Sequence, residues 1–368
     1  MKKPDLRVII SGGGTGGHVF PAISIANELK ETMPMCEILF VGAEGKMEME
    51  KVPAAGYKII GLPVRGFQRK LSTKNISFFY KLIVSIMRAR KIIAEFKPDI
   101  VIGVGGFASG PVLRVATRKK IPTLIQEQNS YAGVTNKILS SRVNVICVAY
   151  EEMEKFFPKE KIVYTGNPVR KDLLNVEKKR EEGLIHFNFR GNRKVLLVLG
   201  GSLGSRTLNR SIQANLDKLI ENKIQVIWQT GKDYYPLAKE IVSKYNSEDI
   251  QVYDFINRMD LVYAIADVII SRAGASTVSE LCLVKKPAIL VPSPNVAEDH
   301  QTKNAMALVN NNAAMMIEDK EAVEKLVDET IILLSDSFRM NVYHENISKM
   351  GVPDSAKRIV DEIIKIID

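Results

Sequence analysis

Short apolar runs alternate along the chain with longer segments whose apolar residues recur at helical spacing. Before residue 150 the runs are RVIIS, EILFVGAE, DIVIGVGG, TLIQEQN and NVICVAY, and after residue 190 they are KVLLVLGG, IQVIWQTG, IQVYDF, DVIISRAG and PAILVPSP. Buried strands that alternate with helices are typical of a parallel sheet covered by helices on both faces. The pattern therefore predicts an α/β protein made of two Rossmann-like, doubly wound domains.

The length of 368 residues also fits two domains, because soluble domains commonly hold about 100–200 residues each. The join is expected near TGNPVRKDLL, just before the charged segment NVEKKREEG. We therefore expect an N-terminal domain over 1–165 and a C-terminal domain over 166–352. In open parallel sheets ligands bind at the carboxyl ends of the strands. Functional residues should thus lie in the loops that follow the apolar runs, in the cleft between the two domains.

The first glycine loop, SGGGTGGH, lies between the strand RVIIS and the predicted helix PAISIANELK. Gly12, Gly14 and Gly17 match a dinucleotide-binding loop, and Glu44 after the next apolar run could bind a ribose. The same spacing also serves ordinary strand-turn-helix packing, where backbone passes close to backbone. His18 favours another interpretation, because an imidazole at a strand's carboxyl end can act as a general base near neutral pH.

Two further loops have the features of phosphate-binding sites. Residues 200–205 (GGSLGS) offer backbone N–H groups and hydroxyls before a predicted helix over 207–220. The segment SRAGASTVSE ends with Glu280, which either complements the helix dipole or accepts hydrogen bonds from a ribose diol. The chain has no Asp-x-Asp pair to bridge a metal, so helix N-termini and Arg170 would meet the charge of a diphosphate. We predict no metal site and no cofactor.

Composition and charge narrow the class of protein. Apolar residues make up 46% of the chain and charged residues 26%, which is ordinary globular usage. The three cysteines are far apart and lack metal-ligand spacing, so buried structural thiols are expected. No signal-peptide core or membrane-length apolar run is present, which predicts a soluble, cytoplasmic protein. The net charge of +10 is uneven: residues 1–170 hold 26 basic and 14 acidic residues, and residues 171–368 hold 26 and 28.

Seven motifs, spread over most of the chain in a fixed order, carry a specific resemblance. They are GGGTGGHVFPA (12–22), GVGGFASGP (103–111), QEQNSYAG (126–133), GNPVR (166–170), GGSLGSRTLN (200–209), SRAGASTVSE (271–280) and AEDHQTKNA (297–305). On these motifs the chain resembles the MurG family of peptidoglycan glycosyltransferases, a branch of glycosyltransferase family 28 with the GT-B fold. The resemblance implies two Rossmann-like domains with a cleft between them. It also implies that the amphipathic C-terminal helix over 353–368 packs back on the first domain.

The resemblance further implies a reaction in the synthesis of the bacterial cell wall. Members transfer N-acetylglucosamine from UDP-N-acetylglucosamine to the C4 hydroxyl of the muramyl sugar of lipid I, which gives lipid II. The anomeric centre inverts in one displacement, without a metal. Such a displacement needs a base on the acceptor hydroxyl and stabilisation of the departing UDP. The implied partners are UDP-N-acetylglucosamine, lipid I, the anionic inner-membrane surface and other cell-wall synthesis proteins.

Matched motif by motif, the resemblance assigns roles to single residues. His18 is the favoured base, and Glu127 is a second candidate base or an acid that orients His18. Family members can carry two glutamines where this chain has His300 and Gln301, so either side chain could contact the sugar. The implied substrate-binding residues are Thr15, Gly16, Gly17, Asn129, Arg170, Ser202, Ile256, Ala275, Ser276, Thr277, Val278, Ser279, Glu280 and Gln301.

The implied roles of the donor-binding residues differ. Arg170 and Ser202 would bind the diphosphate, and the backbone of Ile256 would contact the uracil edge. Residues 275–280 would hold phosphate and ribose, with the carboxylate of Glu280 on the ribose hydroxyls.

The segment from Lys51 to Ala94 has ten basic residues and no acidic one. Its apolar residues recur at helical spacing, which fits either a core-facing stripe with a solvated lysine rim or a surface that lies on anionic lipid. A lipid-linked acceptor favours the second interpretation, with the protein peripheral on the cytoplasmic face of the bacterial membrane. Nucleic acid is not an expected partner, because no recognition module is present. The residues expected to face the membrane are Arg69, Lys70, Phe78, Phe79, Lys81 and Arg88.

Other functions are compatible with parts of the sequence. A UDP-N-acetylglucosamine 2-epimerase or another lipid glycosyltransferase would share the two-domain architecture. A nicotinamide oxidoreductase would use the first glycine loop. A nucleotide-sugar-binding scaffold for other wall-synthesis proteins would bind the donor without turnover.

Overall fold

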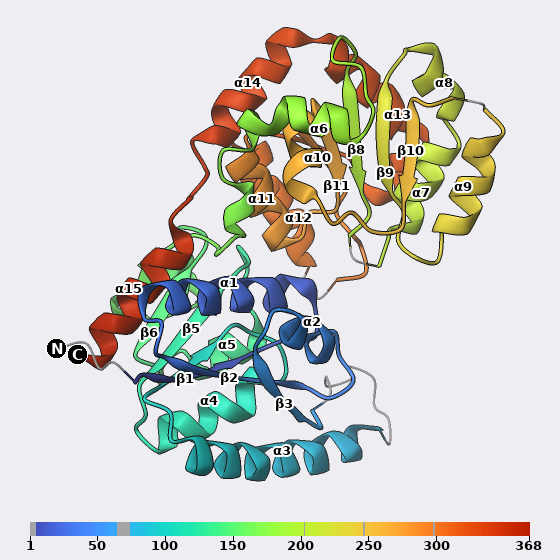
Figure 1. The fold of residues 1–368 in the computed structure, drawn as a ribbon. Helices are drawn as coiled ribbons and strands as arrows, with labels where there is room; N and C mark the ends of the chain where they lie inside the picture. The colour runs from blue at the N-terminus through green and yellow to red at the C-terminus, as the bar shows by residue number, and fades with distance from the viewer. Residues whose placement is uncertain (1–4, 65–73, 202, 246, 297–298) are drawn as a thin grey trace. The chain divides into compact units, whose positions relative to one another are not determined.

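The computed structural model describes residues 5–64, 74–201, 203–245, 247–296 and 299–368. It divides into two compact units, Met1–Val169 with Asp354–Asp368 and Arg170–Pro353, which we call the N-unit and the C-unit. Each unit has one parallel sheet with helices on both faces (Figure 1). The prediction of an α/β protein with two Rossmann-like, doubly wound domains is confirmed.

Within the described residues, the N-unit sheet has seven parallel strands in the order β3-β2-β1-β4-β5-β6-β7. Its strands are β1 (Arg7–Ser11), β2 (Glu37–Ala43), β3 (Lys58–Leu62), β4 (Ile100–Gly103), β5 (Thr123–Glu127), β6 (Val145–Val148) and β7 (Ile162–Tyr164). Its helices are α1 (Gly16–Thr32), α2 (Glu48–Ala54), α3 (Lys74–Phe96), α4 (Ser109–Arg118), α5 (Val134–Leu139) and α15 (Ser355–Ile367).

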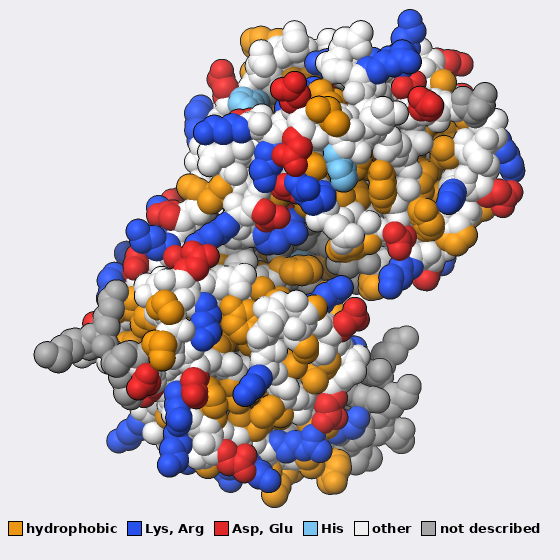
Figure 2. All heavy atoms as spheres, in the orientation of Figure 1, with side chains coloured by type: hydrophobic (Ala, Val, Ile, Leu, Met, Phe, Trp, Pro, Cys, Tyr) orange, Lys and Arg blue, Asp and Glu red, His pale blue; other side chains and the backbone are white. Residues whose placement is uncertain are grey.

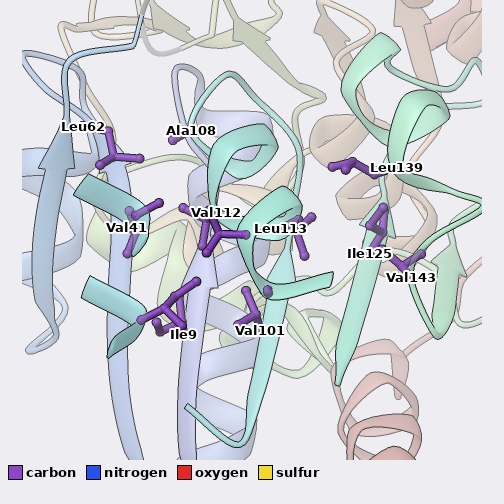
Figure 3. Packing of buried hydrophobic residues seen from close by; sticks show 14 of the residues in the cluster. Ile9, Val41, Leu62, Val101, Ala108, Val112, Leu113, Ile125, Leu139 and Val143 are labelled. Carbon is purple, nitrogen blue, oxygen red and sulfur yellow. The ribbon is translucent and has the colours of Figure 1, made fainter. Parts of the chain in front are cut away.

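Alternate residues of the N-unit strands pack into two hydrophobic clusters. Ile9 and Val101 belong to a cluster with α3, α4 and α5, where side chains of α4 such as Val112 face the strands (Figure 3). Val8 and Ile10 belong to a second cluster that includes α1 and α15. Because successive strand residues point to opposite faces, continuous apolar runs bury both faces of the sheet.

In the described part of the C-unit, the sheet has six parallel strands in the order β10-β9-β8-β11-β12-β13. Its strands are β8 (Val195–Leu199), β9 (Gln225–Gln229), β10 (Ile250–Tyr253), β11 (Val268–Ser271), β12 (Ala288–Leu290) and β13 (Met315–Met316). Its α-helices are α6 (Arg180–His186), α7 (Arg206–Gln213), α8 (Leu216–Glu221), α9 (Tyr235–Ser243), α10 (Met259–Ile265), α11 (Ala275–Val284), α12 (His300–Val309), α13 (Ala322–Ser335) and α14 (Ser337–Ser348).

Two helices differ from the sequence-based expectation. Helix α1 begins at Gly16, before the apolar periodicity that starts at Pro21, because Thr15 is extended and acts as its N-cap. The single helix predicted over 207–220 is interrupted between α7 and α8. There the Asn215 side chain donates a 2.9 Å hydrogen bond to the carbonyl of Ser211, a local bond that competes with helix continuation.

In both sheets the strand order reverses beside the first strand of the unit. Strand β1 lies between β2 and β4, and β8 lies between β9 and β11. Chain connections leave such a point in opposite directions, so a crevice opens at the carboxyl ends of the two strands. The loops after β1 and β4 in the N-unit, and after β8 and β11 in the C-unit, are therefore the expected ligand sites.

Candidate active site

The loop after β1 presents Thr15 and His18 at the start of α1. The Thr15 hydroxyl and Nδ1 of His18 are 3.2 Å apart, which fixes the ring at one nitrogen. The opposite ring edge lies over the loop after β4, since a Cβ on Gly105 would be only 2.9 Å from Nε2 and Cδ2 of His18. A Cβ at this position would therefore push the imidazole out of its place. The two loops at the N-unit switch point meet at His18.

Glu44, a possible ribose acid in the dinucleotide interpretation, has a different partner. It forms an ion pair of 2.5 Å with Arg88 of α3. The N–H of Gly14 in the glycine loop donates instead to the carboxylate of Glu48, at 2.9 Å. Sequence motifs gave no role to Glu48, although its position just after β2 is a signal that could have identified it.

Glu127 at the end of β5 is buried, with 1% of its surface exposed. Its Oε1 accepts from the backbone N–H of Asn129 at 3.1 Å and from the Asn129 side chain at 3.3 Å. Its Oε2 accepts from the N–H of Gly133 at 2.9 Å and from the Asn136 side chain at 2.8 Å. Four donors on one carboxylate hold the loop after β5 in place. This geometry favours a role in positioning Asn129 over a role as base.

Buried amide side chains connect the loops at the carboxyl end of the N-unit sheet. The Gln128 side chain donates to the carbonyl of Val104 at 2.8 Å, and the Gln126 side chain donates to Oδ1 of Asn167 at 2.9 Å. The Asn167 side chain in turn donates to the carbonyl of Gln128 at 2.9 Å. Sequence reasoning missed this network, because its members are separated by many residues along the chain.

In the C-unit, the first turns of α11 carry the segment predicted to bind phosphate and ribose. Ala275 and Val278 are buried, whereas Ser276, Thr277 and Ser279 are partly exposed as residues. The hydroxyl oxygen of Ser276 is itself buried and has no hydrogen-bond partner within the described residues. A buried hydroxyl without a partner at a helix N-terminus is well suited to a phosphate oxygen.

Glu280 lies one helix turn further along α11. Its carboxylate accepts a 2.8 Å hydrogen bond from the hydroxyl of Tyr263, a residue of α10 that is 0% exposed. Burial raises the pKa of Glu280, and the positive charge of Arg170 opposes that rise in pKa. Arg170 also pairs with Asp172 at 3.7 Å. The structure therefore brings Arg170, Tyr263 and Glu280 together. The sequence motifs indicated Arg170 and Glu280, but not Tyr263, because Tyr263 lies among apolar residues of a helix.

The other predicted donor-binding residues follow different strands of the C-unit: Ile256 follows β10, Ser202 follows β8 and Gln301 follows β12. Ile256 is buried, and its backbone N–H donates to the side chain of Gln229 at 3.2 Å. Gln301 on α12 accepts a 2.8 Å hydrogen bond from the N–H of Ser293, which ties its side chain to the loop after β12. Ser202 lies outside the described residues.

Of the residues predicted to face a membrane, Arg88 is exposed, and Phe78 and Lys81 are partly exposed on α3. Arg69, Lys70 and the side chain of Phe79 lie outside the described part of the chain.

The sequence of this chain matches two known family models. The model of the glycosyltransferase family 28 N-terminal domain matches residues 8–148, and that of the family 28 C-terminal domain matches residues 195–359. The chain belongs to glycosyltransferase family 28. The N-terminal match lies within the N-unit, and the C-terminal match lies mainly in the C-unit. Together they contain the glycine loops of both switch points.

A similar relative in the family comes from Parabacteroides distasonis and is named UDP-N-acetylglucosamine--N-acetylmuramyl-(pentapeptide) pyrophosphoryl-undecaprenol N-acetylglucosamine transferase. It is 58% identical over 362 residues, which are 98% of this chain and 98% of the relative. Among solved structures, MurG of Acinetobacter baumannii is 27% identical with a TM-score of 0.78, over 98% of this chain and 99% of that chain. These matches confirm the predicted GT-B fold class and the resemblance to the MurG family.

The fold is shared with proteins outside the family. The UDP-GlcNAc 2-epimerase of Neisseria meningitidis bound to UDP-GlcNAc has a TM-score of 0.67 over 98% of this chain and 100% of that chain, at 15% identity. At this identity the likeness concerns the fold alone.

Proposed function

We infer that this family 28 enzyme transfers N-acetylglucosamine from UDP-N-acetylglucosamine to the C4 hydroxyl of the muramyl sugar of lipid I, and so forms lipid II in peptidoglycan synthesis. The observation that carries the inference is the 58% identity, over nearly the whole of both chains, to a relative named for this transfer. The seven motifs also support it, because their described residues fall in the loops and helix starts that follow strands at the carboxyl ends of both sheets.

The proposed chemistry in the N-unit is a single inverting displacement with His18 as the base. Thr15 pairs with Nδ1 of His18. We assign the tautomer in which Nδ1–H donates to the threonine hydroxyl and Nε2 is the proton acceptor. Glu127 holds the loop after β5 through its four hydrogen bonds, and Asn129 of that loop binds a sugar. Gly16 and Gly17 start α1 beside this site and allow a sugar to approach the backbone.

The proposed donor site is in the C-unit. The N-terminus of α11, with residues 275–279, binds phosphate through its N–H groups and hydroxyls. The guanidinium of Arg170 offsets diphosphate charge and the hydroxyl of Ser202 donates a hydrogen bond to it, without a metal. The backbone of Ile256 contacts the uracil, Glu280 accepts from the ribose hydroxyls, and Gln301 binds the sugar.

Transfer of radiolabelled sugar from UDP-N-acetylglucosamine to a short-chain lipid I analogue tests the function. We expect turnover that persists in excess EDTA, because the donor charge is met by Arg170 and helix N-termini. We expect a β-linked product by NMR, because a single displacement inverts the anomeric centre. Donor incubated without acceptor should stay unchanged, whereas an epimerase would convert it. Loss of turnover in EDTA with recovery on adding Mg²⁺ or Mn²⁺ would contradict the metal-independent mechanism alone.

Helix α3 carries apolar side chains on two opposite faces. Ile92 and Ile93 pack in the N-unit core, whereas Tyr80, Ile83 and Met87 are 70%, 59% and 62% exposed. At 3.6 residues per turn, residues 80, 83 and 87 share the face opposite to 92 and 93. Figure 2 shows apolar and basic side chains interspersed along the edge of the N-unit over α3.

This exposed face supports a peripheral membrane site for the lipid-linked acceptor. None of the described helices has the length and hydropathy of a membrane span. We place α3 on the anionic lipid of the cytoplasmic face, where a nucleotide-sugar donor is available. Exposed apolar side chains would enter the interface, and Lys81 would attract the lipid charge. Arg88 and Lys91 would contribute less, because Glu44 and Glu95 pair with them.

Replacing Ile83 and Met87 together by aspartate should reduce binding to vesicles of phosphatidylglycerol by about 10-fold or more, because two apolar side chains no longer enter the lipid. Co-sedimentation at fixed salt measures the effect. The control is Phe338→Asp, an apolar position that is even more exposed (78%) on α14 of the C-unit, which should leave vesicle binding unchanged. Equal loss in both variants would argue against a specific α3 surface.

A further inference from the structure

A buried carboxylate lies beneath the first glycine loop. Glu48, the first residue of α2, is 1% exposed. Its Oε2 accepts a 2.9 Å hydrogen bond from the N–H of Gly14, and its Oε1 accepts one of 2.9 Å from the N–H of Ala43. One side chain therefore joins the loop after β1 to the end of β2. Both bonds are charge-assisted, which makes them stronger than bonds between neutral groups.

The surrounding backbone is built to admit this carboxylate. A Cβ on Gly13 would lie 2.1 Å from Oε1 of Glu48, and a Cβ on Gly42 would lie 2.6 Å from its Cγ. Gly13 also has a φ of +142°, a conformation that favours glycine. On its other side, the carbonyl oxygen of Gly13 would be 2.3 Å from a Cβ on Gly106. The loop is thus held between Glu48 and the backbone after β4.

The start of α1 has backbone hydrogen bonds from His18 and Val19 to the Thr15 carbonyl, but it has no side-chain cap. Thr15 is the N-cap of α1, but its side chain makes no capping hydrogen bond, because its hydroxyl pairs with His18. Glycines precede Thr15 and follow it, so the loop would lose considerable conformational entropy on being ordered. The contact between Glu48 and Gly14 adds a restraint from outside the loop, one residue from Thr15.

We propose that Glu48 is a positioning residue for the transfer reaction: its carboxylate fixes Gly14 and thereby the placement of Thr15 and His18. The proposal rests on the proposed function. It assigns Glu48 no contact with substrate. Since a misplacement of about 1 Å can lower the rate of an enzyme about 100-fold, loss of this restraint should act on turnover.

The test compares Glu48→Gln with Glu28→Gln in the radiolabelled transfer assay. Glutamine keeps the size of the side chain and one acceptor oxygen, but it cannot accept at both positions. We expect kcat to fall about 10- to 100-fold, while KM for UDP-N-acetylglucosamine stays within about 2-fold. Glu28 is a buried carboxylate at the far end of α1, 8% exposed, and its replacement should leave kcat unchanged.

Hydrogen exchange provides a second, direct measurement. The Gly14 amide should be protected in the wild-type protein and exchange faster in Glu48→Gln, with little change in the core strand β1. A kcat equal to wild type, or a loss of kcat that is matched by Glu28→Gln, would overturn the proposal. Absence of transfer by the wild-type protein would instead count against the proposed function, while the exchange result would still decide whether Glu48 holds the loop.

Discussion

His18→Ala should lower the rate of transfer to a lipid I analogue by about 100- to 10,000-fold, the usual contribution of a general base. Binding of UDP-N-acetylglucosamine should stay nearly normal, because the residues proposed to bind its uracil, ribose and diphosphate belong to the C-unit, whereas His18 belongs to the N-unit. Steady-state kinetics with varied acceptor, together with calorimetry of donor binding, separate the two effects. Turnover near the wild-type level would remove His18 as the base.

Thr15→Val tests whether the threonine hydroxyl orients His18. Valine keeps the shape of threonine but loses the hydroxyl that lies 3.2 Å from Nδ1 of His18. The imidazole would remain and lose only its orientation, so the rate should fall by less than in His18→Ala. If Thr15→Val were as inactive as His18→Ala, the hydroxyl would have a more direct part in the chemistry than orienting the ring.

Glu280→Ala should raise Kd for UDP-N-acetylglucosamine by about 10- to 150-fold, which corresponds to the 1.5–3 kcal/mol of a hydrogen bond to a charged group. The rate with saturating donor should change much less, because Glu280 is proposed to contact the ribose and not the reacting sugar. Calorimetric titration with the donor measures the effect. An unchanged donor affinity would refute the ribose role and leave Glu280 as a structural partner of the Tyr263 hydroxyl.

The Tyr263 hydroxyl offers a control for the same site. Tyr263→Phe removes the 2.8 Å hydrogen bond to Glu280 but keeps the carboxylate, so it should weaken donor binding less than Glu280→Ala. Burial raises the pKa of Glu280. As the pH falls, the carboxylate is therefore protonated earlier than an ordinary glutamate, and wild-type donor affinity should decline with it. In Glu280→Gln, the decline of donor affinity that follows protonation of this carboxylate should be absent.

Most of the fold could be predicted from the sequence, because parallel strands buried on both faces leave continuous apolar runs. RVIIS and KVLLVLGG each became the first strand of a sheet, and the loops after them became the switch points. The start of α1 could not be predicted from apolar periodicity, because Gly16 and Gly17 are poor helix formers and the N-cap depends on the extended backbone of Thr15.

The candidate site was predictable only where its residues form local motifs. His18 and Glu280 stand in recognisable loops, whereas Glu48, Tyr263 and Gln128 act through partners distant in the sequence. In helix α3 the sequence was also insufficient, because the apolar positions alone did not reveal that Ile83 is exposed while Ile93 is buried. Burial is a property of the packed sheet and helices, and spacing along one helix does not determine which of two apolar faces is covered.

Helix α15 has a consequence for how the protein forms during synthesis. Ile359, Val360 and Ile363 complete the N-unit core against α1, although they are translated after the whole C-unit. Most of the N-unit therefore leaves the ribosome before the C-unit, but the N-unit is completed after it. Until these residues emerge, the apolar side chains of α1 that they cover stay open to solvent or to chaperones. A fragment that ends at Val169 would keep this exposed surface permanently and should aggregate.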